Sequence, residues 1–288
     1  MPAQPPFFRL VTSKVGALSM VSPARFAFWA SSSGLSALAA DVALGGRPGA
    51  FLLSAASLGW GALVTSGVFF PWLEMYGGVV CRGPRGNAQV ALTFDDGPHP
   101  DTTARVLRLL EGTPHRASFF VLGNKVRKYP ELARAIVEGG HTIGIHGDTH
   151  DRLHSFRTPW RVRDELLRAS EAVEAATGKR PWLFRPPLGH TTPATLRGAR
   201  RAGVTPIGWS ARGYDGIRGR PPEAVVREVT RSLDDGAIVL LHDAAEHDDF
   251  VPAGVPALPV LLDELERRRL RSIELERWLG TETGSAGT

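Results

Sequence analysis

Cysteine is nearly absent from this chain of 288 residues, in which Cys81 stands alone. One cysteine cannot form an internal disulfide framework, and it cannot supply a cysteine-based zinc cluster. Disordered, collagen-like and coiled-coil chains are also excluded, because 43% of the residues are hydrophobic and 22% are charged without a repeat. The length predicts one large domain, or a large domain with a small addition, that buries a core without cross-links.

Blocks of like charge are missing as well. The net charge is +5, from 34 Lys and Arg against 29 Asp and Glu that are scattered along the chain. A basic chain raises the expectation of a nucleic-acid or an anionic membrane partner. We find no helix-turn-helix, zinc-finger or stacking-aromatic pattern in the sequence, and we therefore expect no nucleic-acid partner.

The N-terminal quarter contains a long stretch without charge. No charged residue occurs between Arg47 and Glu74, where the sequence runs GAFLLSAASLGWGALVTSGVFFPWL. A bilayer is crossed by about 20 apolar residues, so this stretch is long enough to span one. A shorter, serine-rich stretch, FAFWASSSGLSALAA, lies between Arg25 and Asp41. The GGRPG segment between the two stretches is typical of a tight connection between helices.

These features predict a hydrophobic helical hairpin, with helices at 26–44 and 49–73, that forms a membrane-anchor region over residues 1–77. Three alternatives stay open: a signal-peptide core, a helix lying flat at the interface, and a buried core helix. The expected location is the cell membrane with two transmembrane helices. Basic residues outside the hairpin favour both ends in the cytoplasm, whereas a single span would place the following domain outside.

From residue 88 onward, short apolar runs alternate with longer amphipathic segments. This alternation favours an α/β fold with a parallel sheet of βα units, and about seven units nearly close a barrel. An open doubly wound sheet is the alternative. TFDDGP follows the first strand in place of a glycine-rich phosphate fingerprint, so nucleotide binding is disfavoured. Strands are expected at 89–94, 117–122, 141–146, 181–185, 204–209, 237–242 and 271–276, and helices near 101–112, 124–139, 159–177, 191–202, 221–235 and 256–270.

Ionisable side chains gather where the expected strands end. In a βα barrel these ends meet at one rim, where active sites form. Five separate strand ends carry such a group, which is unlikely to arise by chance. The residues are Asp95, Asp96, His146, His150, Arg185, Asp215, His242 and Asp243.

His146 and His150 are four residues apart, a spacing that can place two imidazoles on one metal ion. With a carboxylate from the Asp95–Asp96 pair they form a two-histidine, one-carboxylate set, which leaves positions open for water and substrate. Each motif also has a plain structural interpretation. The histidines could lie in a polar surface loop, and the Asp-Asp-Gly-Pro run is typical of a turn.

Five motifs together resemble the NodB-like polysaccharide deacetylases, carbohydrate esterase family four, in that family's order. They are TFDDGP at 93–98, HGDTH at 146–150, RPPLG at 185–189, the region of Asp215 and LLH at 240–242. The resemblance covers residues 88 to 280 and predicts a catalytic domain over 78–288 with a distorted (β/α) barrel of about seven strands. It implies hydrolysis of N- or O-acetyl groups on sugars with a divalent metal, most often zinc.

The resemblance also implies roles for seven residues. Asp95 resembles the general base and His242 the general acid. Arg185 would hold Asp95 charged and oriented, and Asp215 would do the same for His242. The implied metal ligands are Asp96, His146 and His150.

Three positions depart from the family pattern. Gly147 replaces a hydroxyl residue, Leu188 replaces an aromatic residue, and Gly216 replaces a tryptophan. The groups that would break bonds are all present, so these departures bear on the substrate more than on the reaction. The expected substrate is an N-acetylated sugar of a cell-envelope polymer or a lipid-linked sugar. The alternatives are an O-acetyl or formyl substrate, and an inactive sugar-binding relative.

Overall fold

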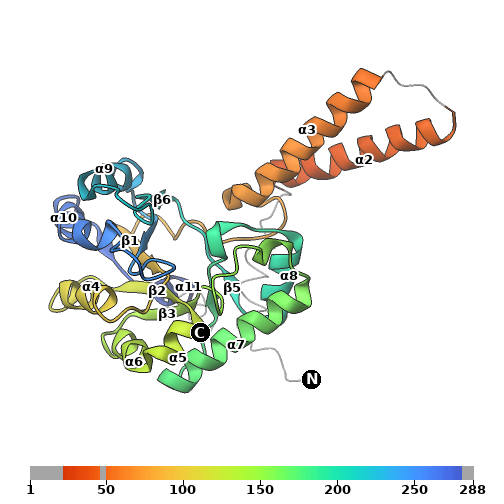
Figure 1. The fold of residues 1–288 in the computed structure, drawn as a ribbon. Coiled ribbons are helices and arrows are strands. Elements are labelled where there is room, and N and C mark those ends of the chain that lie inside the picture. Colours follow the sequence, from red (N-terminus) through yellow and green to blue (C-terminus); the bar gives the residue numbers. More distant parts are fainter. Residues whose placement is uncertain (1–21, 46–49, 281–288) are drawn as a thin grey trace, which may run out of the picture.

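Strands and helices alternate from Gln89 onward in the computed structural model, which describes residues 22–45 and 50–280 (Figure 1). The strands are β1 (Gln89–Asp95), β2 (Ala117–Val121), β3 (Thr142–Ile145), β4 (Leu183–Phe184), β5 (Thr205–Pro206), β6 (Ala211–Arg212), β7 (Ile238–His242) and β8 (Arg271–Ser272). The helices that follow the hairpin are α4 (Thr102–Leu110), α5 (Gly123–Lys128), α6 (Pro130–Glu138), α7 (Pro159–Thr177), α8 (Pro193–Ala202), α9 (Pro222–Ser232), α10 (Gly254–Arg267) and α11 (Leu275–Gly280).

All strand pairs are parallel, in the order β5-β4-β3-β2-β1-β7-β6, with β8 beside β1. A parallel sheet needs crossover connections, and here helices supply them and cover the outside. The order ends at β5 and β6, so the sheet is an open barrel. The predicted distorted (β/α) barrel of about seven strands is therefore confirmed.

Residues ahead of β1 lie along the open side of this barrel. Val80 forms a parallel bridge with Ile207, and Arg82 forms an antiparallel bridge with Ala237. The Val80 amide donates to the Pro206 carbonyl at 3.1 Å, which adds a short stretch of backbone to the edge of β5. The chain between the hairpin and β1 therefore packs onto the sheet.

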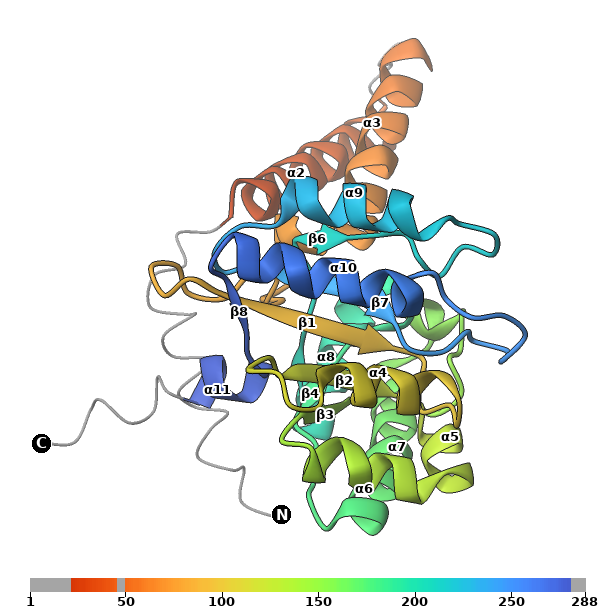
Figure 2. The same ribbon diagram turned by 90° about the vertical axis from the view of Figure 1, so that its left-hand side faces the viewer.

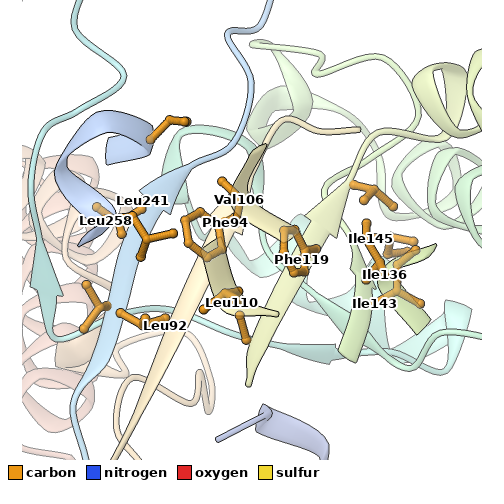
Figure 3. Close-up of a cluster of buried hydrophobic side chains, with 14 of the residues drawn as sticks. Leu92, Phe94, Val106, Leu110, Phe119, Ile136, Ile143, Ile145, Leu241 and Leu258 are labelled. Atoms are coloured by element: carbon orange, nitrogen blue, oxygen red, sulfur yellow. The ribbon is translucent and has the colours of Figure 1, made fainter. Parts of the chain in front are cut away.

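The main core lies between the sheet and the helices outside it (Figure 3). Phe94 of β1 stacks on Phe119 of β2 with ring centroids 5.2 Å apart. Both are fully buried, as is Val106 of α4. Burying a side chain of this size contributes about 1.5 to 3 kcal/mol, so these contacts fix the strands whose ends carry the ionisable residues.

The structure corrects the predicted elements at three places. The expected helix at 124–139 is divided into α5 and α6, because Pro130 has no amide hydrogen to donate within a helix and starts a new one. The two-residue strand β6 is missing from the prediction, since it is too short to show a periodic pattern. The last expected strand ends at Ser272, and α11 begins at Leu275.

Two helices precede the barrel and project away from it as a hairpin (Figure 1). They are α2 (Pro23–Ala43) and α3 (Ala50–Phe69), joined side by side by a hydrogen bond of 3.0 Å from Trp60 Nε1 to Ser32 Oγ. Among the described residues, α3 is the one helix long and apolar enough to cross a membrane, over Leu52–Phe69. The predicted span at 26–44 coincides with α2, and its crossing of a membrane stays a prediction.

The foot of the hairpin is attached to the connection between β4 and α8. The Thr191 amide donates to the Val68 carbonyl at 3.1 Å. The edge of the Phe69 ring meets the His190 ring, with centroids 4.6 Å apart. Behind α3, the Tyr76 hydroxyl donates to the Val64 carbonyl at 2.7 Å. These contacts set the position of the hairpin relative to the barrel.

Candidate active site

The carboxyl ends of the parallel strands bring the predicted residues to one end of the barrel. Figure 2 shows β1 pointing toward the loops that gather there. Asp95 at the end of β1 lies directly opposite His242 at the end of β7 in the sheet register. Both line a cleft of about 510 Å³. Asp96, His146, His150 and Asp215 also line this cleft.

Asp96, His146 and His150 form a group that could hold a metal ion, with their ligand atoms within 4.8 Å of one another. Asp96 Oδ1 lies 3.5 Å from His146 Nε2 and 3.6 Å from His150 Nε2. This oxygen is buried and has no hydrogen-bond partner among the described residues. An unpartnered buried carboxylate oxygen between two imidazole nitrogens fits a divalent cation such as Zn²⁺.

The imidazole of His146 is held by its other ring nitrogen. His146 Nδ1 lies 2.8 Å from the Arg185 carbonyl, which makes Nδ1 the protonated nitrogen and leaves Nε2 free as a ligand. Burial, with the nearby His150 and Arg185, holds the pKa of His146 well below its usual value, so the ring is neutral as metal binding requires.

Glu246 stands behind the second histidine and is missing from the sequence-based prediction. Its Oε1 lies 3.4 Å from His150 Nδ1, and Arg152 binds its other oxygen at 2.6 Å. A carboxylate in this position orients a ligating imidazole and makes it more basic. Glu246 follows β7 in a polar loop, where nothing in the sequence distinguishes it from the neighbouring acidic residues.

Asp95 is buried beside the metal group and is held by Arg185. Arg185 Nη1 donates to Asp95 Oδ1 at 2.8 Å and to Thr93 Oγ1 at 2.7 Å. Asp95 Oδ2 lies 3.9 Å from His146 Nε2 and so faces the metal group. Burial raises the pKa of Asp95 to about 6, even though the Arg185 charge lowers it.

His242, which is partly buried, pairs with the buried Asp215 beside Asp95. His242 Nδ1 donates to Asp215 Oδ1 at 3.0 Å, and the His242 amide donates to Oδ2 at 2.7 Å. Burial by itself would lower the pKa of His242, but the charge and hydrogen bond of Asp215, with Asp95 and Asp96 nearby, raise this pKa to about 10. His242 is therefore a cation at neutral pH whose Nε2 is left for the cleft.

Asp243, the remaining strand-end carboxylate, does not line the cleft. It is fully buried, accepts a hydrogen bond from Thr103 Oγ1 and packs against Gly97, where a side chain would overlap its carboxylate. Burial raises the pKa of Asp243 to about 7. Its position supports the turn that presents Asp95 and Asp96.

The three departures from the family pattern surround the predicted ligands and acid. Gly147 has φ +100° and lies against Glu165, which accepts a hydrogen bond of 3.3 Å from the Asp148 amide. Leu188 is half exposed on the cleft wall. Gly216 lies over the His242 ring, where an added Cβ would come within 3.1 Å of Cε1.

Comparisons with known proteins agree on one family. Residues 82–207 match the model described as polysaccharide deacetylase. A peptidoglycan-N-acetylglucosamine deacetylase of Bacillus cereus is 32% identical over 208 residues, which cover 72% of this chain and 95% of that protein. A chitooligosaccharide deacetylase of Bradyrhizobium sp. is 41% identical over 194 residues, covering 64% and 87%. The structure of a family 4 acetyl xylan esterase from Clostridium thermocellum, in complex with a cobalt ion, matches at a TM-score of 0.61 and 29% identity, covering 68% and 92%.

Proposed function

The chain belongs to the polysaccharide deacetylase family, and from this we propose that it hydrolyses the N-acetyl groups of a cell-envelope carbohydrate with a bound divalent metal ion. Its enzyme class is that of hydrolases acting on carbon–nitrogen bonds other than peptide bonds. One observation carries the mechanistic part of the proposal. A buried carboxylate, a metal-ligand group and a histidine paired with a carboxylate face one cleft, an arrangement that fits the roles of base, Lewis-acid site and acid.

We assign the metal ion to Asp96, His146 and His150, with Zn²⁺ as the expected ion. When bound, such an ion polarises an acetyl carbonyl and lowers the pKa of a water molecule toward about 7. Arg185 keeps Asp95 oriented so that Oδ2 accepts the proton of the attacking water. His242 donates a proton to the departing amine nitrogen, while Asp215 stabilises its imidazolium form.

The full chain is assayed on three substrates to identify the acyl group that it removes and the linkage that it cleaves. An N-acetylated chitooligosaccharide should release acetate, and the sugar product should carry free amines. Release of acetate from an O-acetylated xylan alone would favour the esterase alternative. Release of formate from an N-formylated sugar alone would favour the deformylase alternative. No release from any of them, with metal bound, would favour an inactive sugar-binding relative.

The pH dependence of kcat/KM should report the His242–Asp215 pair. An acid catalyst loses its proton above its pKa, so kcat/KM should fall on the alkaline side as His242 loses its proton, and the charge and hydrogen bond of Asp215 move this limb to higher pH. Asp215→Asn removes the charge that raises this pKa, and we expect the alkaline limb to move to lower pH by about 1 to 3 pH units. Asp249→Asn, which removes an exposed carboxylate of the same cleft, should leave the limb in place. An unchanged limb in Asp215→Asn would contradict the assignment of His242 as the acid.

Gly216→Ala should lower kcat by displacing the acid. Its Cβ would lie 3.1 Å from His242 Cε1 and 3.3 Å from both ring nitrogens, so the imidazole must shift by a few tenths of an ångström. A misplacement of 1 Å at a reacting group costs about 100-fold in rate, and we expect a loss of about tenfold here. Steady-state kinetics on a chitooligosaccharide measure it. A variant with full kcat would show that the ring has room to move without cost.

We further propose that residues 1–77 anchor the catalytic domain, 78–288, in the cell membrane. The α3 helix is apolar on all sides, and only 6% of its Leu52–Phe69 segment is buried. A helix that is apolar all round is normally covered by protein or by lipid. Because the barrel does not cover α3, lipid is the partner that fits. A membrane location brings lipid-linked sugars, in addition to polymers, within reach as substrates.

A further inference from the structure

Two arginines contact Tyr214, a residue of the cleft wall, and neither forms an ion pair with a carboxylate among the described residues. Arg212, at the end of β6, and Arg220 both lie against the Tyr214 ring, with guanidinium carbons 4.2 Å and 5.5 Å from its centroid. Arg212 is exposed and lines the cleft. The Arg220 Nε atom is buried without a hydrogen-bond partner in the described part of the chain.

The two other arginines that line the cleft with Arg212 are paired with carboxylates, which sets Arg212 apart. Arg152 binds Glu246 at 2.6 Å, and Arg218 binds Asp249. An unpaired guanidinium in a cleft is well suited to a phosphate, which it can hold with charge-assisted, bidentate hydrogen bonds. Tyr214 itself has φ +57°, a conformation that costs a non-glycine residue about 1 to 3 kcal/mol and that clusters at ligand sites.

The foot of the hairpin lies beside the same wall. Gly189 lines the cleft and packs so closely on Trp209 that a Cβ would overlap its ring. The next residue, His190, contacts Phe69 at the end of the apolar helix. Both views of the fold place the foot of α3 on the side of the barrel that carries β6 (Figures 1 and 2).

Exposed aromatic residues mark where the apolar helix would leave a bilayer. Phe70 and Trp72 directly follow α3 and are 43% and 52% exposed. Tryptophan side chains such as that of Trp72 collect at membrane–water interfaces. The lipid surface would therefore lie close to the cleft wall that carries Leu188, Trp209 and Arg212.

We propose that the substrate is an acetylated sugar joined through a phosphate to a membrane lipid. The phosphate lies against Arg212, with Arg220 behind Tyr214 adding positive charge, and the lipid stays in the bilayer at the hairpin foot. This inference rests on the proposed deacetylation. It narrows the substrate to an anionic glycolipid. The positive charge of Arg212 fits the phosphate of such a molecule, and the position of the hairpin fits its lipid.

The test uses the full chain reconstituted in phosphatidylcholine vesicles. One probe is N-acetylglucosamine linked by a phosphate diester to a long-chain alcohol, and its match carries a neutral ether linkage to the same alcohol. We expect kcat/KM for acetate release to be at least about tenfold higher for the phosphate probe, the effect of one hydrogen bond to a charged group. Arg212→Gln should remove most of that ratio, whereas Arg105→Gln, on the exposed surface of α4, should leave it unchanged.

A flexible insertion of ten glycine and serine residues between Gly77 and Gly78 tests the hairpin. It keeps the anchor but frees its foot from the cleft, so hydrolysis of the vesicle-bound probe should fall relative to soluble chitotetraose. Equal rates on both lipid probes would overturn the phosphate subsite and leave deacetylation standing. A requirement for Arg212 only when anionic phosphatidylglycerol is added would show that it binds the lipid surface and would also overturn the proposal. No acetate from any probe would remove the proposed function as well.

Discussion

Asp95→Asn is expected to lower kcat by about 100- to 10,000-fold, the range that general-base catalysis contributes. The amide keeps the size of the side chain and can still accept the hydrogen bond that Arg185 donates at 2.8 Å. It cannot accept a proton from water at Oδ2, the oxygen that faces the metal group at 3.9 Å from His146 Nε2. Acetate release and metal content of the same preparation measure the two effects separately, and metal should be retained.

Two variants control this prediction. His146→Ala removes a ligand, so both metal and turnover should be lost. Asp263→Asn changes an exposed carboxylate on α10 and should keep kcat. Near-normal turnover in Asp95→Asn would show that another group is the base.

Arg185→Met is expected to destabilise the fold by about 3 to 5 kcal/mol, because it leaves a buried carboxylate without its cation. Arg185 is fully buried and also donates to Thr93 Oγ1 and to the Gly208 carbonyl. Urea unfolding of the metal-free protein in detergent measures the loss. The double variant Arg185→Met with Asp95→Asn should recover part of it, since the unpaired charge is then gone.

The loss of folding stability in Arg185→Met should depend on pH. In the metal-free protein the pKa of Asp95 is about 6, and removing Arg185 takes away a charge that lowers it. In the folded variant Asp95 therefore takes up a proton between about pH 8 and pH 5, whereas in the unfolded chain it does not. Because only the folded state gains this proton, the stability of the variant rises as the pH falls. The difference from the unchanged protein should be larger at pH 8 than at pH 5. An equal loss at both pH values would mean that packing, rather than the unpaired charge, determines the cost.

The strand ends were predictable from the sequence because two signals coincide there. In QVALTFDD an apolar run gives the buried strand β1, and the acidic pair follows at the point where β1 ends. The same reasoning places His242 at the end of β7, opposite Asp95 in the sheet. Parallel pairing then brings together residues that lie 147 positions apart, without any need to know the loops.

Features that depend on loop conformation were not predictable. Glu246 reaches His150 only through the path of the loop after β7. Tyr214 has a left-handed backbone conformation and contacts Arg212 and Arg220, and no sequence pattern predicts either feature. The two-residue strand β6 carries too few residues for a pattern. Such features follow from tertiary contacts rather than from local propensity.

The measurement that tests the central claim most directly is metal content together with acetate release, with and without a chelator. We would use the full chain in detergent with a chitooligosaccharide and a peptidoglycan fragment as substrates. The account predicts that the protein binds a divalent ion through Asp96, His146 and His150, and that the chelator abolishes acetate release while added metal restores it. Acetate release that persists in metal-free protein would contradict it.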